Sequence, residues 1–136
     1  MAFNHPHIVK IKRIADLRGN LAVIEQGREI GFKPERCYWL TDVPSGENRD
    51  GHAYRTASEL IVALAGCFDV NVETPDGYKE SFRMHAPDTG LLVPPLVWRR
   101  FSNFTTNAVA LVVSSTSFRP EDYIRNHNEF INFNNG

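Results

Sequence analysis

Short runs in which apolar and polar residues alternate dominate the chain. Residues 68–73 alternate strictly, and residues 8–14 include a stretch that puts Val9, Ile11 and Arg13 on one face. A period of two residues predicts β-strands. Four further segments, rich in residues that favour strands, extend this prediction to residues 20–25, 36–43, 90–95 and 108–113.

A nearly unbroken apolar run occupies residues 59–65 and ends at Gly66. The run is short for a helix, and its flanking glycine favours a buried strand. Pro75, Asp76 and Gly77 predict a hairpin turn, because proline presets φ and glycine accepts a positive φ. Short strands at this spacing, punctuated by Gly and Pro, are typical of a sandwich or barrel, and a jelly roll fits best.

Only the C-terminal segment has a helical pattern. Pro120 opens it, and Glu121 and Asp122 supply the negative charge that favours a helix N-terminus. A helix from this point would bring four apolar side chains to one side: Tyr123, Ile124, Phe130 and Ile131. The Asn-rich tail at 132–136 is expected to fray. With no linker or repeat, the prediction is one all-β domain over residues 1–136 with a short C-terminal helix.

The chain has 136 residues and a formal net charge of -1, from 15 basic and 16 acidic side chains. This length is enough for one domain with a real core. The charge argues against nucleic acid or a membrane as a partner, because such partners usually demand a basic excess. No stretch has the roughly 20 apolar residues needed to span a bilayer, and the N-terminus lacks a signal-peptide pattern. Cys37 and Cys67 have apolar or aromatic neighbours, which predicts small buried thiols in the reducing cytoplasm.

The main candidate for chemistry is His52. Tyr54 follows two residues later, and Glu59 opens the apolar run that Gly66 ends. This layout resembles the first motif of the cupins, jelly-roll proteins whose fold is also called a double-stranded β-helix. In metal cupins the corresponding three side chains bind a metal, but a tyrosine stands here at the second position.

A second cupin-like motif runs from Pro94 to Asn103, and these two residues hold its outer positions. Arg99 stands where metal cupins have their last histidine. A guanidinium is permanently charged, offers only donors and cannot ligate a cation. Of four potential metal ligands, the sequence keeps only His52 and Glu59. We therefore expect no metal site, and a pocket that attracts an anionic or oxygen-rich ligand.

Five segments match the motifs of one cupin family in their order and spacing: residues 16–21, 36–39, 49–52, 90–99 and 121–125. They resemble the sugar 3,4-ketoisomerases that act on dTDP-4-keto-6-deoxyglucose, also called WxcM-like cupins, over almost the whole chain. The resemblance implies a homodimer, active without metal or organic cofactor. The resemblance also implies the reaction of this family, which moves a keto group from C4 to C3 of a dTDP-linked 4-keto-6-deoxyhexose. The product would feed amino-sugar synthesis for surface polysaccharides such as O-antigen.

This reaction needs a proton to leave C3, an enediolate to be stabilised and a proton to reach C4. Histidine is the usual shuttle near neutral pH, hydroxyl groups can stabilise the enediolate, and arginine matches phosphate geometry. The resemblance and this chemistry assign catalytic roles to His52, Tyr38 and Tyr54. They assign substrate contacts to seven further residues: Arg18, Arg36, Arg49, Glu59, Trp98, Arg99 and Asn103.

Two positions depart from the family. Its motif normally carries His-x-His, and Tyr54 replaces the second histidine, while Glu59 stands where the relatives usually have Gln. A phenol can donate and accept a hydrogen bond, but with a pKa near about 10 it is a weak base at neutral pH. His52 would therefore be the single base. Glu59 could instead pair with His52 or with an arginine.

Strand alternation separates neighbouring side chains, because successive residues point to opposite faces. Alternation turns one residue of each pair into the barrel interior: by its family position we expect this to be Tyr38 rather than Trp39, and we expect Arg99 rather than Arg100. Trp98 is expected to form part of the pocket wall rather than to react.

Two other functions remain open. A nucleotide-sugar 3,5-epimerase would use the same deprotonation beside a ketone, and a non-catalytic nucleotide-sugar-binding cupin would suit the loss of the second histidine. A metal-dependent dioxygenase is a third alternative, which a metal assay of the purified protein would test. The sequence also leaves open whether the product has galacto or gluco stereochemistry at C4.

Overall fold

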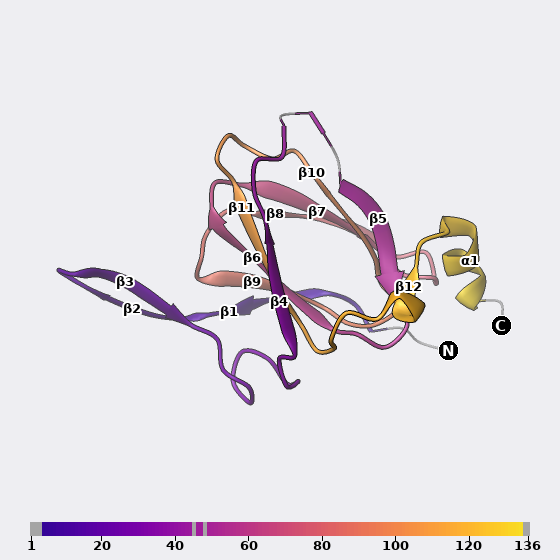
Figure 1. The fold of residues 1–136 in the computed structure, drawn as a ribbon, viewed down its shortest axis with the longest axis horizontal. Helices are drawn as coiled ribbons and strands as arrows, with labels where there is room; N and C mark the ends of the chain where they lie inside the picture. Colours follow the sequence, from indigo (N-terminus) through magenta and orange to yellow (C-terminus); the bar gives the residue numbers. More distant parts are fainter. Residues whose placement is uncertain (1–3, 45, 48, 135–136) are drawn as a thin grey trace.

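The strands form two five-stranded antiparallel sheets that face each other, in a computed structural model that describes residues 4–44, 46–47 and 49–134 (Figure 1). The first sheet contains, in spatial order, β1 (His7–Lys10), β9 (Thr89–Val93), β6 (Glu59–Ala65), β11 (Val109–Ser114) and β4 (Arg36–Leu40). The second contains β12 (Tyr123–Ile124), β5 (Arg49–Tyr54), β10 (Trp98–Ser102), β7 (Phe68–Glu73) and β8 (Lys79–Met84). This arrangement confirms the predicted all-β cupin jelly roll.

The core lies between the two sheets. On β7 buried and half-buried residues alternate, so Phe68, Val70 and Val72 point inward. Ile61 and Ala63 of β6 belong to the same buried cluster. Each large apolar side chain that is fully buried contributes roughly 1.5–3 kcal/mol. The cluster therefore holds the two sheets, and the polar side chains that lie between them, in a fixed relation.

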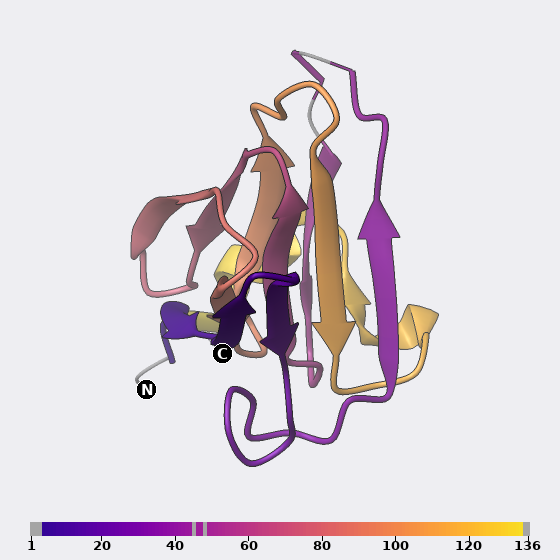
Figure 2. The same ribbon diagram turned by 90° about the vertical axis from the view of Figure 1, so that its left-hand side faces the viewer.

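A hairpin of β2 (Lys12–Asp16) and β3 (Gly19–Val23) projects away from the two main sheets in Figure 1. Figure 2 looks along this hairpin onto the first sheet, where β11 lies between β4 and β6. The alternating residues 8–14 do not form one strand as expected. Ile11 is buried against Ile30 and Val62, and this contact separates β1 from β2.

The C-terminal segment differs from the prediction. Pro120–Asp122 forms a single 3-10 turn, and Tyr123–Ile124 then pairs with β5 as the short strand β12. The carboxylate of Asp122, a buried residue, accepts hydrogen bonds from the backbone N–H groups of Thr56 and Ala57. These bonds draw the chain alongside β5 in an extended path, so the helix cannot begin at Pro120.

The helix itself, α1, spans only His127–Ile131. Asn126 caps it, because its side chain accepts a hydrogen bond from the backbone N–H of Glu129. Phe130 is fully buried as predicted, whereas Ile131 is exposed. Asn132–Asn134 forms a 3-10 turn rather than a frayed end; the rest of the predicted frayed tail, residues 135–136, lies outside the described residues.

The predicted hairpin turn is confirmed between β7 and β8, where Gly77 has φ 94° and its N–H donates to the Thr74 carbonyl over 3.0 Å. The strands β5 and β8 were not predicted. β8 lies at the edge of the second sheet and is mostly exposed, so its sequence carries no apolar pattern. β5 has no apolar pattern either, since it contains charged residues, glycine and histidine. Some of its side chains line the pocket described below.

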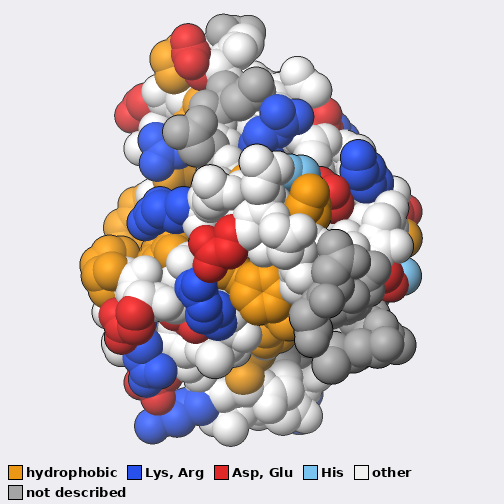
Figure 3. Space-filling model, turned by 90° about the vertical axis from the view of Figure 1, so that its right-hand side faces the viewer, with side chains coloured by type: hydrophobic (Ala, Val, Ile, Leu, Met, Phe, Trp, Pro, Cys, Tyr) orange, Lys and Arg blue, Asp and Glu red, His pale blue; other side chains and the backbone are white. Residues whose placement is uncertain are grey.

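The two cysteines are free, but Cys37 is exposed and Cys67 is half-buried, so the prediction of two buried thiols is wrong for Cys37 and only partly met by Cys67. Alternation on β4 explains the error, because Cys37 shares the outward face with Trp39. Among the described residues, no helix is long and apolar enough to cross a membrane. On the face shown in Figure 3, basic and acidic side chains are interspersed rather than gathered by sign.

Candidate active site

A pocket of about 530 Å³ opens between the two sheets. Its wall combines aromatic, cationic and apolar side chains from four strands and from the segments on either side of β12: Tyr38, Leu40, Arg49, His52, Tyr54, Arg99, Phe101, Phe118, Tyr123 and Arg125. Strand pairing places Arg99 on β10 beside His52 on β5, so both side chains project from the same face of the second sheet. The pocket therefore brings together all three residues that the sequence assigned to catalysis.

Arg99 and Glu59 form an ion pair at the base of this pocket. Nε of Arg99 lies 2.9 Å from Oε1 of Glu59, and Nη2 lies 3.1 Å from Oε2. Their side chains are only 4% and 1% exposed. Burial lowers the pKa of Arg99, but the Glu59 carboxylate together with Tyr38 and Tyr54 more than offsets this and holds that pKa above its ordinary value. Arg99 points inward as predicted and Arg100 is exposed.

This ion pair joins two of the residues predicted to contact substrate, of which Arg99 lines the pocket and Glu59 does not. Both oxygens of Glu59 are occupied and the residue is fully buried, so its carboxylate is a partner of Arg99 rather than a surface for substrate. The charge of Arg99 is likewise neutralised inside the protein. Pairing of Glu59 with an arginine was one of the alternatives that the sequence left open, and it is the one observed.

The Tyr38 hydroxyl bridges the same pair. It donates to Oε2 of Glu59 over 2.9 Å and accepts from Nη2 of Arg99 over 2.7 Å. Burial raises the pKa of Tyr38 to about 12, although the Arg99 guanidinium offsets part of the rise. Tyr38 is therefore a neutral phenol at physiological pH. Its inward orientation is as predicted, as is the outward one of Trp39, which is 63% exposed.

His52 and Tyr54 form the second half of the polar interior. Nε2 of His52 lies 3.1 Å from the Tyr54 hydroxyl oxygen, and the two rings meet edge to face. Burial raises the pKa of Tyr54 far above its usual range, and the charge of Glu59 raises it further. Tyr54 can exchange hydrogen bonds with its neighbours, but it cannot serve as a base at neutral pH.

Among the wall residues that sequence reasoning missed, two are polar: Tyr123 and Arg125. They belong to the segment that was predicted to be helical, and β12 instead adds it to the edge of β5. The Tyr123 ring lies 5.0 Å from that of His52, and Cζ of Arg125 lies 4.2 Å from the centre of the Tyr123 ring. A period of two around the buried Ile124 was the available signal, because it puts Tyr123 and Arg125 on one face of a strand.

Three of the predicted arginines lie in different surroundings. Arg49 is exposed and lines the pocket. Arg36 is not in its wall, but Cζ of Arg36 lies 5.5 Å from the Tyr38 ring and 5.6 Å from the Phe118 ring. Nε of Arg36 is buried without a hydrogen-bond partner among the described residues. Arg18 lies at the turn of the β2–β3 hairpin, is exposed, and pairs with Asp16 over 2.7 Å, away from the pocket wall of its own chain.

Trp98 does not contribute to this pocket, which corrects its assignment. It precedes Arg99 on β10, so alternation turns the indole to the opposite face, where it packs against His127 and Phe130. Gly51 makes room for it, because a Cβ at that position would lie 2.3 Å from Nε1 of Trp98.

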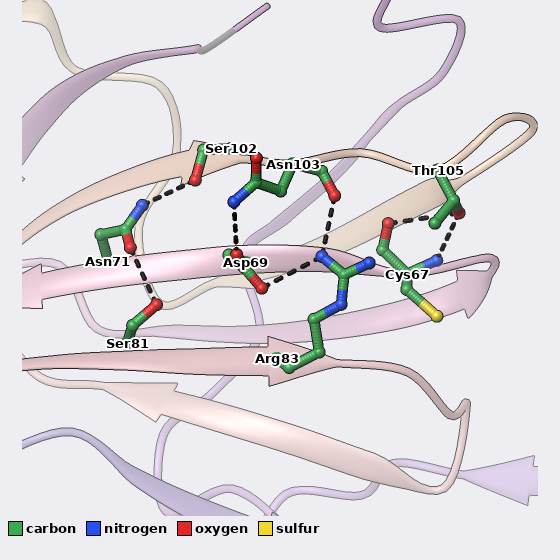
Figure 4. Close-up of polar contacts among 8 residues, drawn as sticks. All are labelled: Cys67, Asp69, Asn71, Ser81, Arg83, Ser102, Asn103 and Thr105. Atoms are coloured by element: carbon green, nitrogen blue, oxygen red, sulfur yellow. Dashed lines mark hydrogen bonds and ion pairs between the residues drawn. The ribbon is translucent and has the colours of Figure 1, made fainter. Parts of the chain in front are cut away.

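Asn103 is also outside the pocket. It follows β10 with φ 54°, and its side-chain amide donates to Oδ2 of Asp69 over 2.7 Å (Figure 4). Nη1 of Arg83 donates to the backbone carbonyl of Asn103 over 2.8 Å. Figure 4 shows that these contacts link the turn to β7 and β8. Asn103 therefore secures a turn instead of contacting substrate.

The chemistry of the remaining polar groups is that of acids, bases and hydrogen-bond donors. Within the part of the chain that the structure describes, no group of three or more His, Cys, Asp or Glu side chains could hold a metal ion. The one imidazole in the pocket contacts a phenol, and the one carboxylate beneath it is paired with a guanidinium. The fold and the pocket thus define a class of protein: a small cupin whose interior contains groups that can transfer protons.

Comparison with known proteins identifies the family. The family model described as WxcM-like, C-terminal (FdtA) matches residues 4–135. A curated relative, the TDP-4-oxo-6-deoxy-alpha-D-glucose-3,4-oxoisomerase of Aneurinibacillus thermoaerophilus, is 31% identical over 123 residues, which cover 90% of this chain and 88% of the relative. The chain belongs to the WxcM-like family.

Two solved structures are similar over almost their whole length. QdtA, a sugar 3,4-ketoisomerase from Thermoanaerobacterium thermosaccharolyticum solved in complex with TDP, has a TM-score of 0.90 and 32% identity, covering 94% of this chain and 93% of that one. The WlaRB TDP-quinovose 3,4-ketoisomerase of Campylobacter jejuni has a TM-score of 0.90 and 28% identity, covering 95% and 98%. The relatives that match in sequence and in fold are therefore sugar 3,4-ketoisomerases.

Proposed function

We propose that this protein is a nucleotide-sugar 3,4-ketoisomerase that converts dTDP-4-keto-6-deoxyglucose to a dTDP-linked 3-keto-6-deoxyhexose. The observation that carries the proposal is one imidazole, His52, held against the phenol of Tyr54 in a pocket between the sheets. Family membership supports the same activity. The product would serve the synthesis of deoxyamino sugars for surface polysaccharides.

In this proposal His52 removes the proton from C3, the hydroxyl hydrogen at O3 moves to O4 of the enediolate, and His52 delivers a proton to C4 after exchange with solvent. Tyr54 is too weak a base for either step, because burial keeps it protonated. The imidazolium that forms on His52 supplies positive charge beside the enediolate, and Arg49 lines the same pocket. The Arg99–Glu59 pair adds no net charge and holds Tyr38 in place.

The diphosphate of the carrier nucleotide is assigned to the pocket rim. Arg49 and Arg125 both line the pocket, and both residues are exposed. A guanidinium matches phosphate geometry and forms charge-assisted hydrogen bonds to it. Arg36 can join them, since its buried Nε has no partner among the described residues. The rings of Phe118 and Tyr123 form the neighbouring wall.

We also propose that the protein is a homodimer. The β2–β3 hairpin presents Leu17, which is fully exposed, and Leu21, which is 57% exposed, while Trp39 is exposed on β4. Large apolar side chains gathered on an outer surface favour association. A second copy could then bring Arg18 to the substrate. Light scattering of the purified protein measures the assembly, and a stable monomer would contradict this part of the proposal.

A cytoplasmic location belongs to the same proposal. Cys37 and Cys67 are free thiols, and one of them is exposed. Exposed free thiols persist in reducing compartments.

The experiment that tests the activity is a proton NMR time course with freshly made dTDP-4-keto-6-deoxyglucose in deuterated buffer. A 3,4-ketoisomerase produces the 3-keto sugar and places deuterium at C4. A 3,5-epimerase would exchange the hydrogens at C3 and C5 and keep the ketone at C4. A protein that only binds the nucleotide sugar would exchange no carbon-bound hydrogen, and that result would refute the proposal.

A further inference from the structure

One side of the pocket is formed by the C-terminal segment, which joins the second sheet through a very short strand. Phe118, Tyr123 and Arg125 all line the pocket. β12 has only two residues, and Tyr123 pairs in it with Tyr54 of β5. The side chain of Ile124 is fully buried, but alternation turns it to the face opposite Tyr123. The position of Tyr123 in the wall therefore depends on contacts made next to the strand.

Asp122, the residue before β12, makes the first of these contacts. Its Oδ1 accepts hydrogen bonds from the backbone N–H of Thr56 over 2.9 Å and from the Thr56 hydroxyl over 2.8 Å. Its Oδ2 accepts from the backbone N–H of Ala57 over 3.1 Å. Asp122 is 5% exposed, and hydrogen bonds are stronger where water is excluded. Both carboxylate oxygens thus tie the C-terminal segment to the residues that follow β5.

Arg55 adds a second set of contacts between the same two parts of the chain. Its backbone N–H donates to the Asp122 carbonyl over 2.8 Å. Its Nη1 donates to the Tyr123 carbonyl over 2.8 Å, and its Nη2 donates to Oε1 of Glu129 over 2.6 Å. We call the contacts of residues 55–57 with Asp122 and with the Tyr123 carbonyl the clamp. Because the clamp grips the backbone of Tyr123 and of the residue before it, it fixes where the Tyr123 ring lies.

The ring that the clamp holds packs against the candidate base. The centre of the Tyr123 ring lies 5.0 Å from that of His52 and 4.7 Å from that of Tyr54. The rings of His52 and Tyr54 are themselves 4.9 Å apart. His52 therefore packs against one ring from its own strand and against one from the C-terminal segment. A general base must be aligned with the proton that it removes, and a misplacement of about 1 Å can cost about 10²-fold in rate.

We propose that Asp122 is a positioning residue, which holds Tyr123 against His52 through the clamp and thereby orients the imidazole toward the substrate. Asp122 itself is bound by backbone groups and does not line the pocket, so it acts only through Tyr123. The catalytic part of this role rests on the proposed isomerase function. The packing of the two rings is a property of the substrate-free protein, so the two can be tested separately.

A double-variant cycle on kcat tests the proposal. In Asp122→Asn an NH₂ group replaces one acceptor oxygen, so at least one donor of the clamp loses its partner. We expect kcat to fall about 10²-fold. Tyr123→Leu, which removes the ring and leaves the clamp, should lower kcat by at least as much. The double variant should be no slower than Tyr123→Leu, because both changes act through the same ring. An unchanged kcat in Asp122→Asn, or losses that multiply in the double variant, would overturn the proposal.

Two further variants separate positioning from a general loss of stability. Asp69→Asn is the matched control, because the Asp69 carboxylate also accepts hydrogen bonds from distant residues, Arg83 and Asn103, but outside the pocket. Its kcat should be unchanged, and a fall equal to that of Asp122→Asn would contradict a specific role. Should Asp122→Asn fail to fold, Arg55→Met replaces it in the cycle, because the Arg55 side chain is 39% exposed and its loss should be tolerated. The same lack of additivity with Tyr123→Leu is expected.

NMR of histidine-labelled protein without substrate gives the second readout. The ring signals of His52 are those that disappear in His52→Asn. We expect Asp122→Asn to move them toward their positions in Tyr123→Leu, because the neighbouring ring is displaced in one variant and absent in the other. If these signals move as expected but the unmodified protein isomerises no sugar, the proposed function fails and the positioning of the imidazole stands. If the protein isomerises the sugar but the signals in Asp122→Asn do not move, only the positioning role fails.

Discussion

Arg99 and Arg125 border the same pocket, yet their surroundings have little in common. Arg99 is buried, and Glu59 and Tyr38 together accept three hydrogen bonds from its guanidinium. Arg125 is exposed and contacts the face of Tyr123. A buried guanidinium holds neighbouring side chains in position, because its charge is already balanced within the protein. An exposed one keeps its charge available for an anion, so the interior and the rim of the pocket should respond differently to substitution.

Removing the imidazole tests the interior most directly. His52→Asn should lower kcat by at least about 10²–10⁴-fold, because none of the other described residues that line the pocket can act as a base at neutral pH. Calorimetric titration with dTDP should still detect binding, since the rim arginines are untouched. Loss of dTDP affinity together with activity would show that interior and rim do not act independently.

Breaking the buried ion pair should affect folding rather than binding alone. Arg99→Met leaves Glu59 buried without its counter-charge, which should lower the free energy of unfolding by about 3–5 kcal/mol in urea titrations. The double variant Arg99→Met/Glu59→Leu should recover much of this loss, because it removes the uncompensated charge as well. Arg125→Met is the matched control at the rim, and its stability should change by no more than about 0.5 kcal/mol. Equal destabilisation by both single variants would refute the contrast.

The rim variant should instead weaken nucleotide binding. A hydrogen bond to a charged group contributes about 1.5–3 kcal/mol, so Arg125→Met should raise the Kd for dTDP about 10- to 100-fold. Binding by the unmodified protein should also weaken as salt is added, since exposed charges are screened. An unchanged Kd would remove Arg125 from the diphosphate site.

The smallest expected effect concerns alkaline stability. The pKa of Tyr38 is raised to about 12 in the folded protein, against 10.0 for an unperturbed tyrosine. The unfolded chain therefore loses this proton first, and the stabilisation is complete below about pH 10 and declines as the pH rises toward 12. Urea midpoints measured across this interval should fall less steeply in Tyr38→Phe than in the unmodified protein. Identical slopes would contradict the burial of the Tyr38 hydroxyl.

Alternation along strands predicted that one residue of each neighbouring pair faces inward, because a period of two is a local property of the backbone, and the family resemblance chose Tyr38 over Trp39. The same alternation argues against Trp98 as a substrate contact, because Trp98 precedes Arg99 and must face away from it. That assignment followed position in the family rather than the geometry of the strand. Where the two disagreed, the geometry was correct.

The remaining errors concern contacts between distant parts of the chain. Asp122 looks like a residue of a helix N-terminus, but its carboxylate is bound by backbone N–H groups of Thr56 and Ala57, 66 and 65 residues away. Local propensity contains no information about this contact, so β12 and with it Tyr123 were missed. The Arg99–Glu59 pair spans 40 residues, and the sequence could offer it only as one of several alternatives.

Gly51 has no side chain that could transfer a proton, yet it directly precedes His52, the proposed base. Its missing side chain is what allows the indole of Trp98 to lie against β5, and any larger residue there would press on the strand from the rear. The displaced backbone would carry the neighbouring imidazole with it. In a saturation mutagenesis screen scored by product formation, positions 51 and 52 should therefore look equally intolerant. Only an assay of chemical rescue would separate the residue that reacts from the one that makes room for it.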